Sequence, residues 1–487
     1  MIFNSFNFIV LFPLLFLLYY VIPARYRKAR NWYLLAVSYL LYAKWKPAYA
    51  VVLFGVSLVT YWGGVILGSK FKVESEELET VRVYGSRRKG LAWCFALLSL
   101  LPLLVFKYYN FINESITDGL AAIGLGFSLP GLNWAVPIGI SFFTFQAVGY
   151  LLDVYHGRIK AERNVADYLL FVSFFPSIVA GPINKASLVL PQIKNLRPYF
   201  DYAKTVDGLK MLLWGMFMKV VVADRVALYV DTVLPHYMNY TGVTCFVASV
   251  LYSIQIYADF AGYSLMAIGV GKILGFELTE NFKRPYFAYS ITDFWHRWHI
   301  SLSTWLKDYV YIPLGGSRCS KLKNYWNIFV TFLVSGIWHG ANWTFVVWGC
   351  LHGLFQIVEK ALGIQKLKSD KVWVRLARIL ITFILVTFAW IFFRMPTLGD
   401  AWGVVSRIFD PTLPKTLYLH GFTVTAYIGI GLSILLFKDI RDEFFPKRLL
   451  VFENSLVVVR WAGYLMVMVI ILMAGVFSAD QFIYANF

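Results

Sequence analysis

Two histidines lie in stretches whose other residues are mostly apolar or aromatic. His339 follows the apolar segment 334–338, and His299 closes the aromatic segment 293–299. An ionisable side chain at membrane depth is energetically costly, so it indicates a functional site. Imidazole has a pKa of about 6.5 and can accept and return a proton at neutral pH. His339 could therefore be a structural hydrogen-bonding residue, a proton relay or a catalytic base, and a structural role is open for His299 as well.

Other polar side chains, near these histidines or within apolar runs, are candidates to bind substrate or to support a site. They are Gln255, Asp259, Arg297, Trp338 and Asn342. A buried polar group must find a hydrogen-bond partner, so a purely structural role is open for each of them. His352 faces away from His339 on an ideal helix, and we assign it to packing.

The sequence predicts neither a metal site nor a bound cofactor. His296 and His299 could reach a metal from one helix face, but even with Asp293 they form no convincing ligand set. The four cysteines lack metal-ligand spacing. Neither a phosphate-binding P-loop nor a G-x-S-x-G nucleophile motif occurs in the sequence.

The composition is that of a multi-pass membrane protein. Of the 487 residues, 59% are hydrophobic and only 15% are charged, and the mean hydropathy is +0.63. The net charge is +18, but basic residues gather in short segments between apolar runs, as in 25–30. The positive-inside rule explains this pattern, so we predict a lipid bilayer as the environment and no nucleic-acid partner.

Apolar runs of near-spanning length recur along the whole chain. They are 5–22, 31–47, 49–68, 91–112, 135–154, 167–183, 207–230, 243–258, 325–340, 343–362, 373–394, 421–438 and 457–477. We predict an all-α polytopic protein with about 11–13 transmembrane helices plus re-entrant or interfacial segments. The chain shows no linker, so residues 1–487 are predicted to form a single membrane domain. The first run is expected to be a retained span that places 25–30 in the cytoplasm.

The region 284–324 is polar but lies between apolar neighbours. Trp295, Trp298 and Trp305 recur at helical spacing, which predicts an interfacial or re-entrant helix that 313–318 interrupts. The basic segment 318–323 should face the cytoplasm. Beside His339, two glycines, Gly336 and Gly340, would let a helix or a substrate approach closely.

Six motifs, in order along the chain, resemble those of the membrane-bound O-acyltransferase (MBOAT) family. The resemblance covers most of residues 1–360, and within the family it favours the bacterial proteins that O-acetylate alginate and other polysaccharides. The motifs lie at 137–155, 174–183, 255–263 with 281–285, 294–303, 311–316 and 338–343. His296 stands where the family usually has an arginine.

The resemblance implies a ring of helices around a reaction chamber, with His339 as the catalytic base and His299 as the second functional histidine. It implies an acyl thioester donor, acetyl-CoA or another, on the cytoplasmic side and a polysaccharide hydroxyl acceptor outside the cytoplasmic (inner) membrane. The longest candidate outer loop, 113–134, is short, which independently suggests an extracytoplasmic partner protein. Transfer of D-alanyl or another acyl group is an alternative, as is a proton-coupled transporter or exporter.

Overall fold

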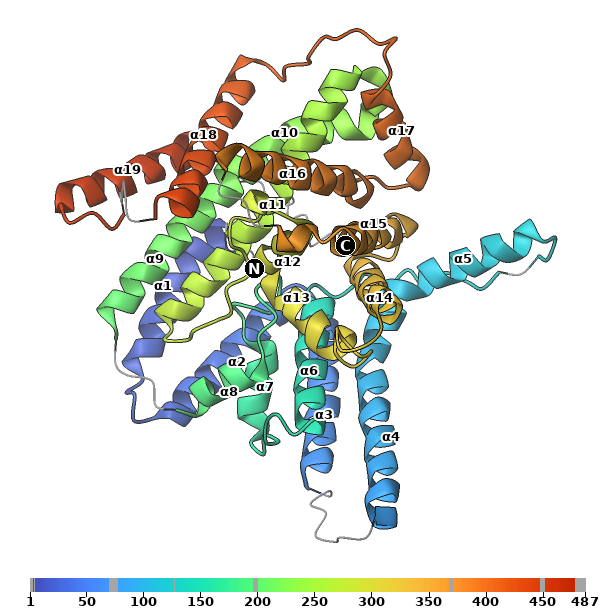
Figure 1. The fold of residues 1–487 in the computed structure, drawn as a ribbon. Helices are drawn as coiled ribbons and strands as arrows, with labels where there is room; N and C mark the ends of the chain where they lie inside the picture. Colours follow the sequence, from blue (N-terminus) through green and yellow to red (C-terminus); the bar gives the residue numbers. More distant parts are fainter. Residues whose placement is uncertain are drawn as a thin grey trace. The chain divides into compact units, whose positions relative to one another are not determined.

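The computed structural model describes residues 3, 5–69, 78–126, 128–195, 200–367, 371–446 and 452–477. Within these ranges the chain forms helices, turns and irregular segments, and no β-strand (Figure 1). The predicted all-α class is therefore confirmed. The chain divides into two compact units, which are described separately below.

The first unit comprises Phe6–Gly208 and Val270–Thr279. Its helices are α1 (Phe6–Val21), α2 (Arg27–Ala43), α3 (Pro47–Ser69), α4 (Leu78–Leu103), the π-helical η1 (Leu104–Tyr108), α5 (Tyr109–Ala122), α6 (Ile140–Tyr155), α7 (Val165–Ser173) and α8 (Ala186–Lys194). Within this unit α3 packs against α4 and α6, and α2 packs against α7. Helix α9 (Tyr202–Met216) begins in this unit and ends in the second.

The second unit comprises Leu209–Gly269 and Glu280–Phe487, with a short N-terminal piece. Its elements are η2 (Phe217–Ala223), α10 (Asp224–Val233), η3 (Leu234–Asn239), most of α11 (Gly242–Ile273), η4 (Pro285–Phe287), α12 (Ile291–Arg297), α13 (Ile300–Leu306), η5 (Lys307–Tyr311), α14 (Lys321–His339), α15 (Trp343–Ala361), η6 (Ile364–Lys366), α16 (Val372–Arg394), α17 (Leu398–Ile408), α18 (Phe422–Phe444) and α19 (Val457–Ala474). All candidate site residues belong to this unit.

Six helical segments of the described chain are long and apolar enough to cross a membrane. They are Pro47–Gly68, Arg87–Ala122, Gly242–Ile273, Val372–Arg394, Phe422–Phe444 and Val457–Ala474. Shorter apolar helices accompany them, including Asn7–Val21 and Ile140–Tyr155. The chain is thus a membrane protein with several spans, whereas the number 11–13 and the single domain stay predictions.

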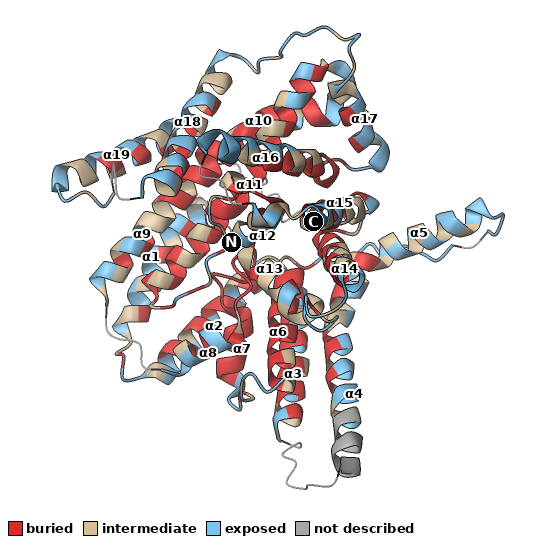
Figure 2. Cartoon of the chain, in the orientation of Figure 1, coloured by how far each residue is buried: buried red, intermediate tan, exposed pale blue. Residues whose placement is uncertain are grey.

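One local expectation in the first unit is wrong. The segment 113–134 is not all loop, because α5 continues to Ala122 and none of its described residues is buried (Figure 2). The helix gives way to a turn containing Gly124, whose φ of +82° is left-handed. Arg30, in the basic segment 25–30, belongs to α2 and is 1% exposed, and its Nε donates to the Ile22 carbonyl at 2.8 Å.

The pair α14 and α15 positions His339. The two helices run side by side (Figure 1). They approach so closely that a Cβ atom on Gly336 would overlap the carbonyl oxygen of Phe345, and one on Gly349 would overlap that of Phe332. Close approach at Gly336 is therefore confirmed, and the neighbour it admits is α15. His339 is the last residue of α14, directly before the chain turns into α15.

The predicted continuous helix through Trp295, Trp298 and Trp305 is wrong. Helix α12 ends at Arg297, and α13 begins at Ile300, because His299 between them adopts a left-handed conformation with φ 43° and ψ 53°. Its neighbour Trp298 is extended. The predicted interruption at 313–318 is confirmed, since 312–317 forms turns. The break at His299 matters because it directs this imidazole into the second unit's interior.

Candidate active site

His339 lies in a buried aromatic environment at the end of α14. Its residue is 3% exposed. Ring centroids lie 5.0 Å away for Trp338, 4.9 Å for Trp348 of α15 and 5.3 Å for Phe393 of α16. Three helices therefore enclose one ionisable group in a largely apolar setting. In such a setting the dielectric is low, so hydrogen bonds and charge interactions of the imidazole are stronger than in water.

His299 is fully buried and close to His339. Its ring lies 4.7 Å from that of Phe260 on α11, and the His299 and His339 centroids are 6.4 Å apart. Trp338 lies against both, with centroid distances of 5.9 Å to His299 and 5.0 Å to His339. We call His299, Trp338 and His339 the histidine pair cluster. The sequence named all three residues, and the structure brings them together.

Burial favours the neutral form of the His299 imidazole. It lies in the connection between α12 and α13, outside the helices long enough to span a membrane. Burial lowers the pKa of its imidazole to about 3, because desolvation disfavours the charged form. A neutral imidazole has one nitrogen that donates and one that accepts a hydrogen bond, so this ring can receive a proton.

Asn281 contacts the imidazole of His299. It was not among the predicted site residues. Its Oδ1 lies 3.1 Å from Nδ1 of His299 and also accepts from Ser301. The motif at 281–285 contained this asparagine, but nothing in its spacing relates it to His299. A loop that runs antiparallel to another cannot be recognised from the two sequences alone, so this contact needed a structure.

Arg297 and Asn342 support the fold around the cluster. The Arg297 guanidinium is ion-paired with Asp293 at 3.0 Å and with Glu443 of α18 at 2.7 Å. The same Glu443 pairs with Arg284 at 2.8 Å. Asn342 caps α15, since its Oδ1 accepts from the Thr344 N–H at 3.0 Å and its Nδ2 donates to the Pro396 carbonyl at 2.8 Å.

Asp259 and Gln255 lie one helical turn apart on α11. Asp259 pairs at 2.8 Å with Lys219 of η2, which also pairs with Asp224 at 2.6 Å. All three charged residues are 1% exposed. Gln255 is buried, and its Oε1 meets no hydrogen-bond donor among the described residues. Sequence reasoning missed Lys219, although a lysine inside the apolar run 207–230 was itself a signal.

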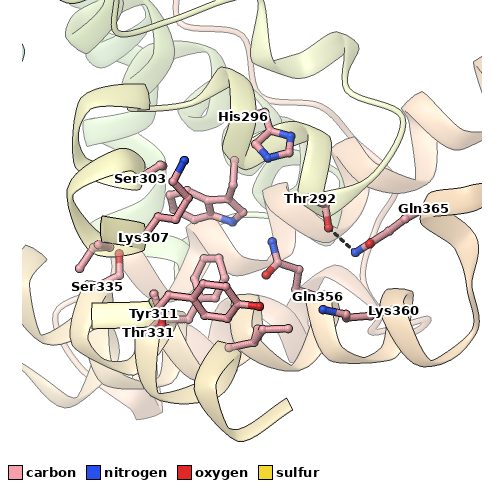
Figure 3. A pocket seen from close by; sticks show the side chains of 14 residues that line it. Thr292, His296, Ser303, Lys307, Tyr311, Thr331, Ser335, Gln356, Lys360 and Gln365 are labelled. Carbon is pink, nitrogen blue, oxygen red and sulfur yellow. Dashed lines mark hydrogen bonds between the residues drawn. The ribbon is translucent and has the colours of Figure 1, made fainter. Parts of the chain in front are cut away.

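A cavity of about 300 Å³ lies between α12, α13, η5, α14 and α15. Figure 3 shows its polar side chains converging from these elements. Its polar lining residues are Thr292, His296, Ser303, Lys307, Tyr311, Thr331, Ser335, Gln356, Lys360 and Gln365. Ser335 lies one turn before His339 on α14, and residues four apart share a helix face. The cavity therefore lies along the face of α14 that also carries His339, and its lining ends at Ser335, one turn before that residue.

The remaining histidines of this region have other surroundings. His352 is fully buried, and its Nδ1 accepts from the Trp295 indole at 3.2 Å, in agreement with a packing role. His296 is exposed and lines the cavity. Since α12 ends before His299, His296 and His299 do not share a helix face. The described residues contain no group of three or more potential metal ligands.

Comparison with known proteins identifies the family. The family model described as "MBOAT, membrane-bound O-acyltransferase family" matches residues 158–396. The chain is also 38% identical to "Probable alginate O-acetylase AlgI" of Pseudomonas aeruginosa, over 84% of this chain and 75% of that protein. The chain belongs to the membrane-bound O-acyltransferase family. This membrane-bound O-acyltransferase is accordingly an acyl-transferring enzyme, and the matched region contains the whole histidine pair cluster.

Two further relatives indicate the range of the family. The chain is 34% identical to the "Peptidoglycan O-acetyltransferase" of Helicobacter pylori, over 83% of this chain and 79% of that protein. It is 28% identical to the "Teichoic acid D-alanyltransferase" of Bacillus subtilis, over 62% of this chain and 78% of that protein. The resemblance seen in the sequence is thereby confirmed for this membrane-bound O-acyltransferase.

Proposed function

We propose that this enzyme transfers an acetyl group from a cytoplasmic thioester to a hydroxyl group outside the cytoplasmic (inner) membrane, in the O-acetylation of a polysaccharide. The observation that carries the proposal is the buried contact between His299, Trp338 and His339. Two imidazoles and an indole at one enclosed point provide proton acceptors and a donor where an acyl group and a hydroxyl can meet.

His339 acts as the general base in this proposal. It takes the proton of the acceptor hydroxyl as that oxygen forms a bond to the acyl carbon. Collapse of the tetrahedral intermediate then breaks the carbon–sulfur bond, and the proton on His339 passes to the leaving thiolate. The enclosed site excludes water, which would otherwise hydrolyse the thioester.

The oxyanion of the intermediate needs hydrogen-bond donors. The sequence suggests His299, Arg297 and Asn342 as such donors. In the structure, Nδ1 of His299 is engaged with Asn281, the Arg297 guanidinium with Asp293 and Glu443, and the Asn342 amide with Pro396. We therefore favour Trp338, a donor-only side chain in contact with both imidazoles.

The cavity along α14 supports a thioester donor such as acetyl-CoA. Lys307 and Lys360 contribute two positive charges, which would attract the phosphate groups of such a donor. Amide and hydroxyl side chains between them, including Gln356 and Thr331, could bond the polar groups of an extended thioester arm (Figure 3). The segment 318–323, which continues into the first turn of α14, is the basic stretch proposed to face the cytoplasm.

Delivery to the polymer is proposed to use an extracytoplasmic partner protein. The exposed helix α5 and the segment after it are too small to bind a long polysaccharide. D-alanyl transfer is a second candidate, because the chain is similar to a "Teichoic acid D-alanyltransferase" over 62% of its length. The two candidates differ in the group that is moved and not in the site.

A gene deletion, complemented with the wild-type protein, tests the proposal. Base-labile acetate and D-alanine are measured on the purified envelope polymers, together with polymer yield. Loss of acetate at unchanged yield supports O-acetylation. Loss of D-alanine alone would transfer the assignment to the second candidate. Loss of the polymer itself would contradict acyl transfer and favour an exporter.

A further inference from the structure

One amide oxygen gathers three hydrogen bonds beside the histidine pair cluster. Oδ1 of Asn281 accepts from the backbone N–H of Ser301 at 3.1 Å and from the Ser301 hydroxyl at 2.9 Å. It also lies 3.1 Å from Nδ1 of His299. Asn281 is 1% exposed and His299 is 0% exposed, so water does not compete for these bonds.

The backbone bond determines the directions of the others. A backbone N–H can only donate, so the Asn281 atom facing Ser301 must be the amide oxygen and not the nitrogen. That oxygen can only accept, so Nδ1 of His299 must carry the proton between them. In a neutral imidazole the other nitrogen, Nε2, then has the lone pair.

The backbone keeps this arrangement in place. The Lys283 N–H donates to the Arg297 carbonyl at 2.9 Å, and the Ile300 N–H donates to the Asn281 carbonyl at 3.0 Å. His299 itself has a φ of 43°, which is uncommon for a residue with a side chain. Such a conformation persists only where its surroundings determine it, and it occurs most often at functional sites.

We propose that Asn281 is a positioning residue that fixes His299 as the Nδ1–H tautomer and leaves its Nε2 as a hydrogen-bond acceptor, in a ring whose centroid lies 6.4 Å from that of His339. This rests on the proposed acyl transfer. The Nε2 lone pair accepts a hydrogen bond from a second, neighbouring hydroxyl of the acceptor and so orients the acceptor, while His339 removes the proton of the attacking hydroxyl. Without Asn281 the ring could protonate Nε2 instead, and it would then repel the hydroxyl proton that it should hold.

Substitutions of Asn281 separate this role from a structural one. Asn281→Ala removes the acceptor, whereas Asn281→Asp keeps an acceptor for all three bonds and adds a negative charge beside Nδ1–H. That charge favours imidazolium at His299, and opposite charges at contact distance raise the pKa of a base by about 1–3 units. A second titratable ring, that of His339, lies against His299. Ser301→Ala is the comparison variant, because it removes the hydroxyl's bond to Asn281 and its longer 3.5 Å contact with Nδ1 of His299 but leaves the bond between Asn281 and His299.

The measurement is transfer of radiolabelled acetyl from acetyl-CoA to envelope polysaccharide in isolated membranes. It is made as a function of pH and normalised to protein amount. We expect Asn281→Ala to lose activity by on the order of 10²-fold or more, since loss of the group that fixes a catalytic histidine's tautomer costs up to about 10⁴-fold in serine proteases. Asn281→Asp should keep activity at high pH, with the acid limb of the profile moved upward. Ser301→Ala should stay near wild type.

An unshifted pH profile for Asn281→Asp would overturn the proposal, even if Asn281→Ala fails to accumulate. Equal activity per protein in Asn281→Ala and wild type would overturn it as well. His339→Ala is measured in the same membranes. If His339→Ala is inactive while the Asn281 variants behave as wild type, only the role of Asn281 fails. If His339→Ala is fully active, the proposed function fails.

Discussion

The imidazoles of His299 and His339 lie 6.4 Å apart at their centroids, and the indole of Trp338 contacts both. His339 comes from the end of a long helix, whereas His299 comes from a left-handed residue between two short ones. Their contact joins two chain segments that carry different family motifs. The first predictions concern what each ring contributes to this contact.

His339→Ala should abolish acetyl transfer while the protein still accumulates in the membrane. Removal of a general base costs about 10²–10⁴-fold in rate. The C-cap of α14 is Gly340, so the helix does not need the imidazole of His339 in order to end there. Base-labile acetate on the surface polysaccharide, compared at equal protein amount, measures the effect. Full acetylation in the variant would show that His339 is structural.

His299→Ala should lose most activity, whereas His296→Arg should keep most of it. His299 is buried in the histidine pair cluster, but His296 is exposed at the cavity and its ring does not reach the cluster. Both variants are assayed side by side for acetate content at matched expression. The reverse ranking would mean that the exposed histidine carries the chemistry.

Lys307→Gln combined with Lys360→Gln should raise the apparent KM for acetyl-CoA more than it changes kcat. Both lysines line the cavity along α14, and loss of uniform binding to a phosphate-bearing donor appears in KM. The effect should weaken at higher ionic strength, which screens the lysines in the wild type. The matched control replaces Lys321 and Lys323, which do not line this cavity. A larger KM effect in the control would place the donor at the basic segment instead.

Cys319 should be labelled by a membrane-impermeant thiol reagent only after cells are permeabilised. It lies in the basic segment 318–323, which the positive-inside rule assigns to the cytoplasm, and it is partly exposed. The other three cysteines, of which Cys94 is exposed, are first replaced by alanine. Labelling of intact cells would reverse the proposed orientation of the donor cavity.

Lys219→Met should reduce the amount and thermal stability of the protein in detergent. It would leave Asp224 and Asp259 buried beside each other without a cation, and breaking a buried pair costs about 3–5 kcal/mol. The control is Lys204→Met, which breaks an exposed pair with Glu277 worth about 0–1 kcal/mol. Adding Asp224→Asn and Asp259→Asn to Lys219→Met should recover stability. No recovery would mean that the three groups act through packing.

The sequence predicted the helical class and the two histidines for separate reasons. Long apolar runs require helices at membrane depth, because every backbone polar group must be bonded within the segment. His339 and His299 were recognisable because ionisable residues are rare there. Local rules failed at His299 itself, where tryptophan spacing predicted a continuous helix. The left-handed His299 is stabilised by a contact with Asn281, which is distant in the sequence, and the periodicity of a local segment cannot predict such a contact.

The roles of Arg297 and Asp259 show the same limit. Both were identified as polar groups that needed partners, but the partners are Glu443 and Lys219, which come from other elements. Residue type alone determined that a partner must exist. The identity of each partner depends on the packing of α18, which supplies Glu443, and of η2, which supplies Lys219, in the second unit.

The ion pairs of Glu443 have a consequence for biosynthesis. Arg284 and Arg297 are made 159 and 146 residues before the carboxylate that joins them. During synthesis, therefore, the segment that carries His299 exists for a long interval with Asp293 as the partner of Arg297 and without Glu443. These ion pairs are complete only when the last turn of α18 has left the ribosome. A chain truncated before that helix would contain both histidines, but Arg284 would lack its carboxylate partner and Arg297 would have only Asp293 of its two.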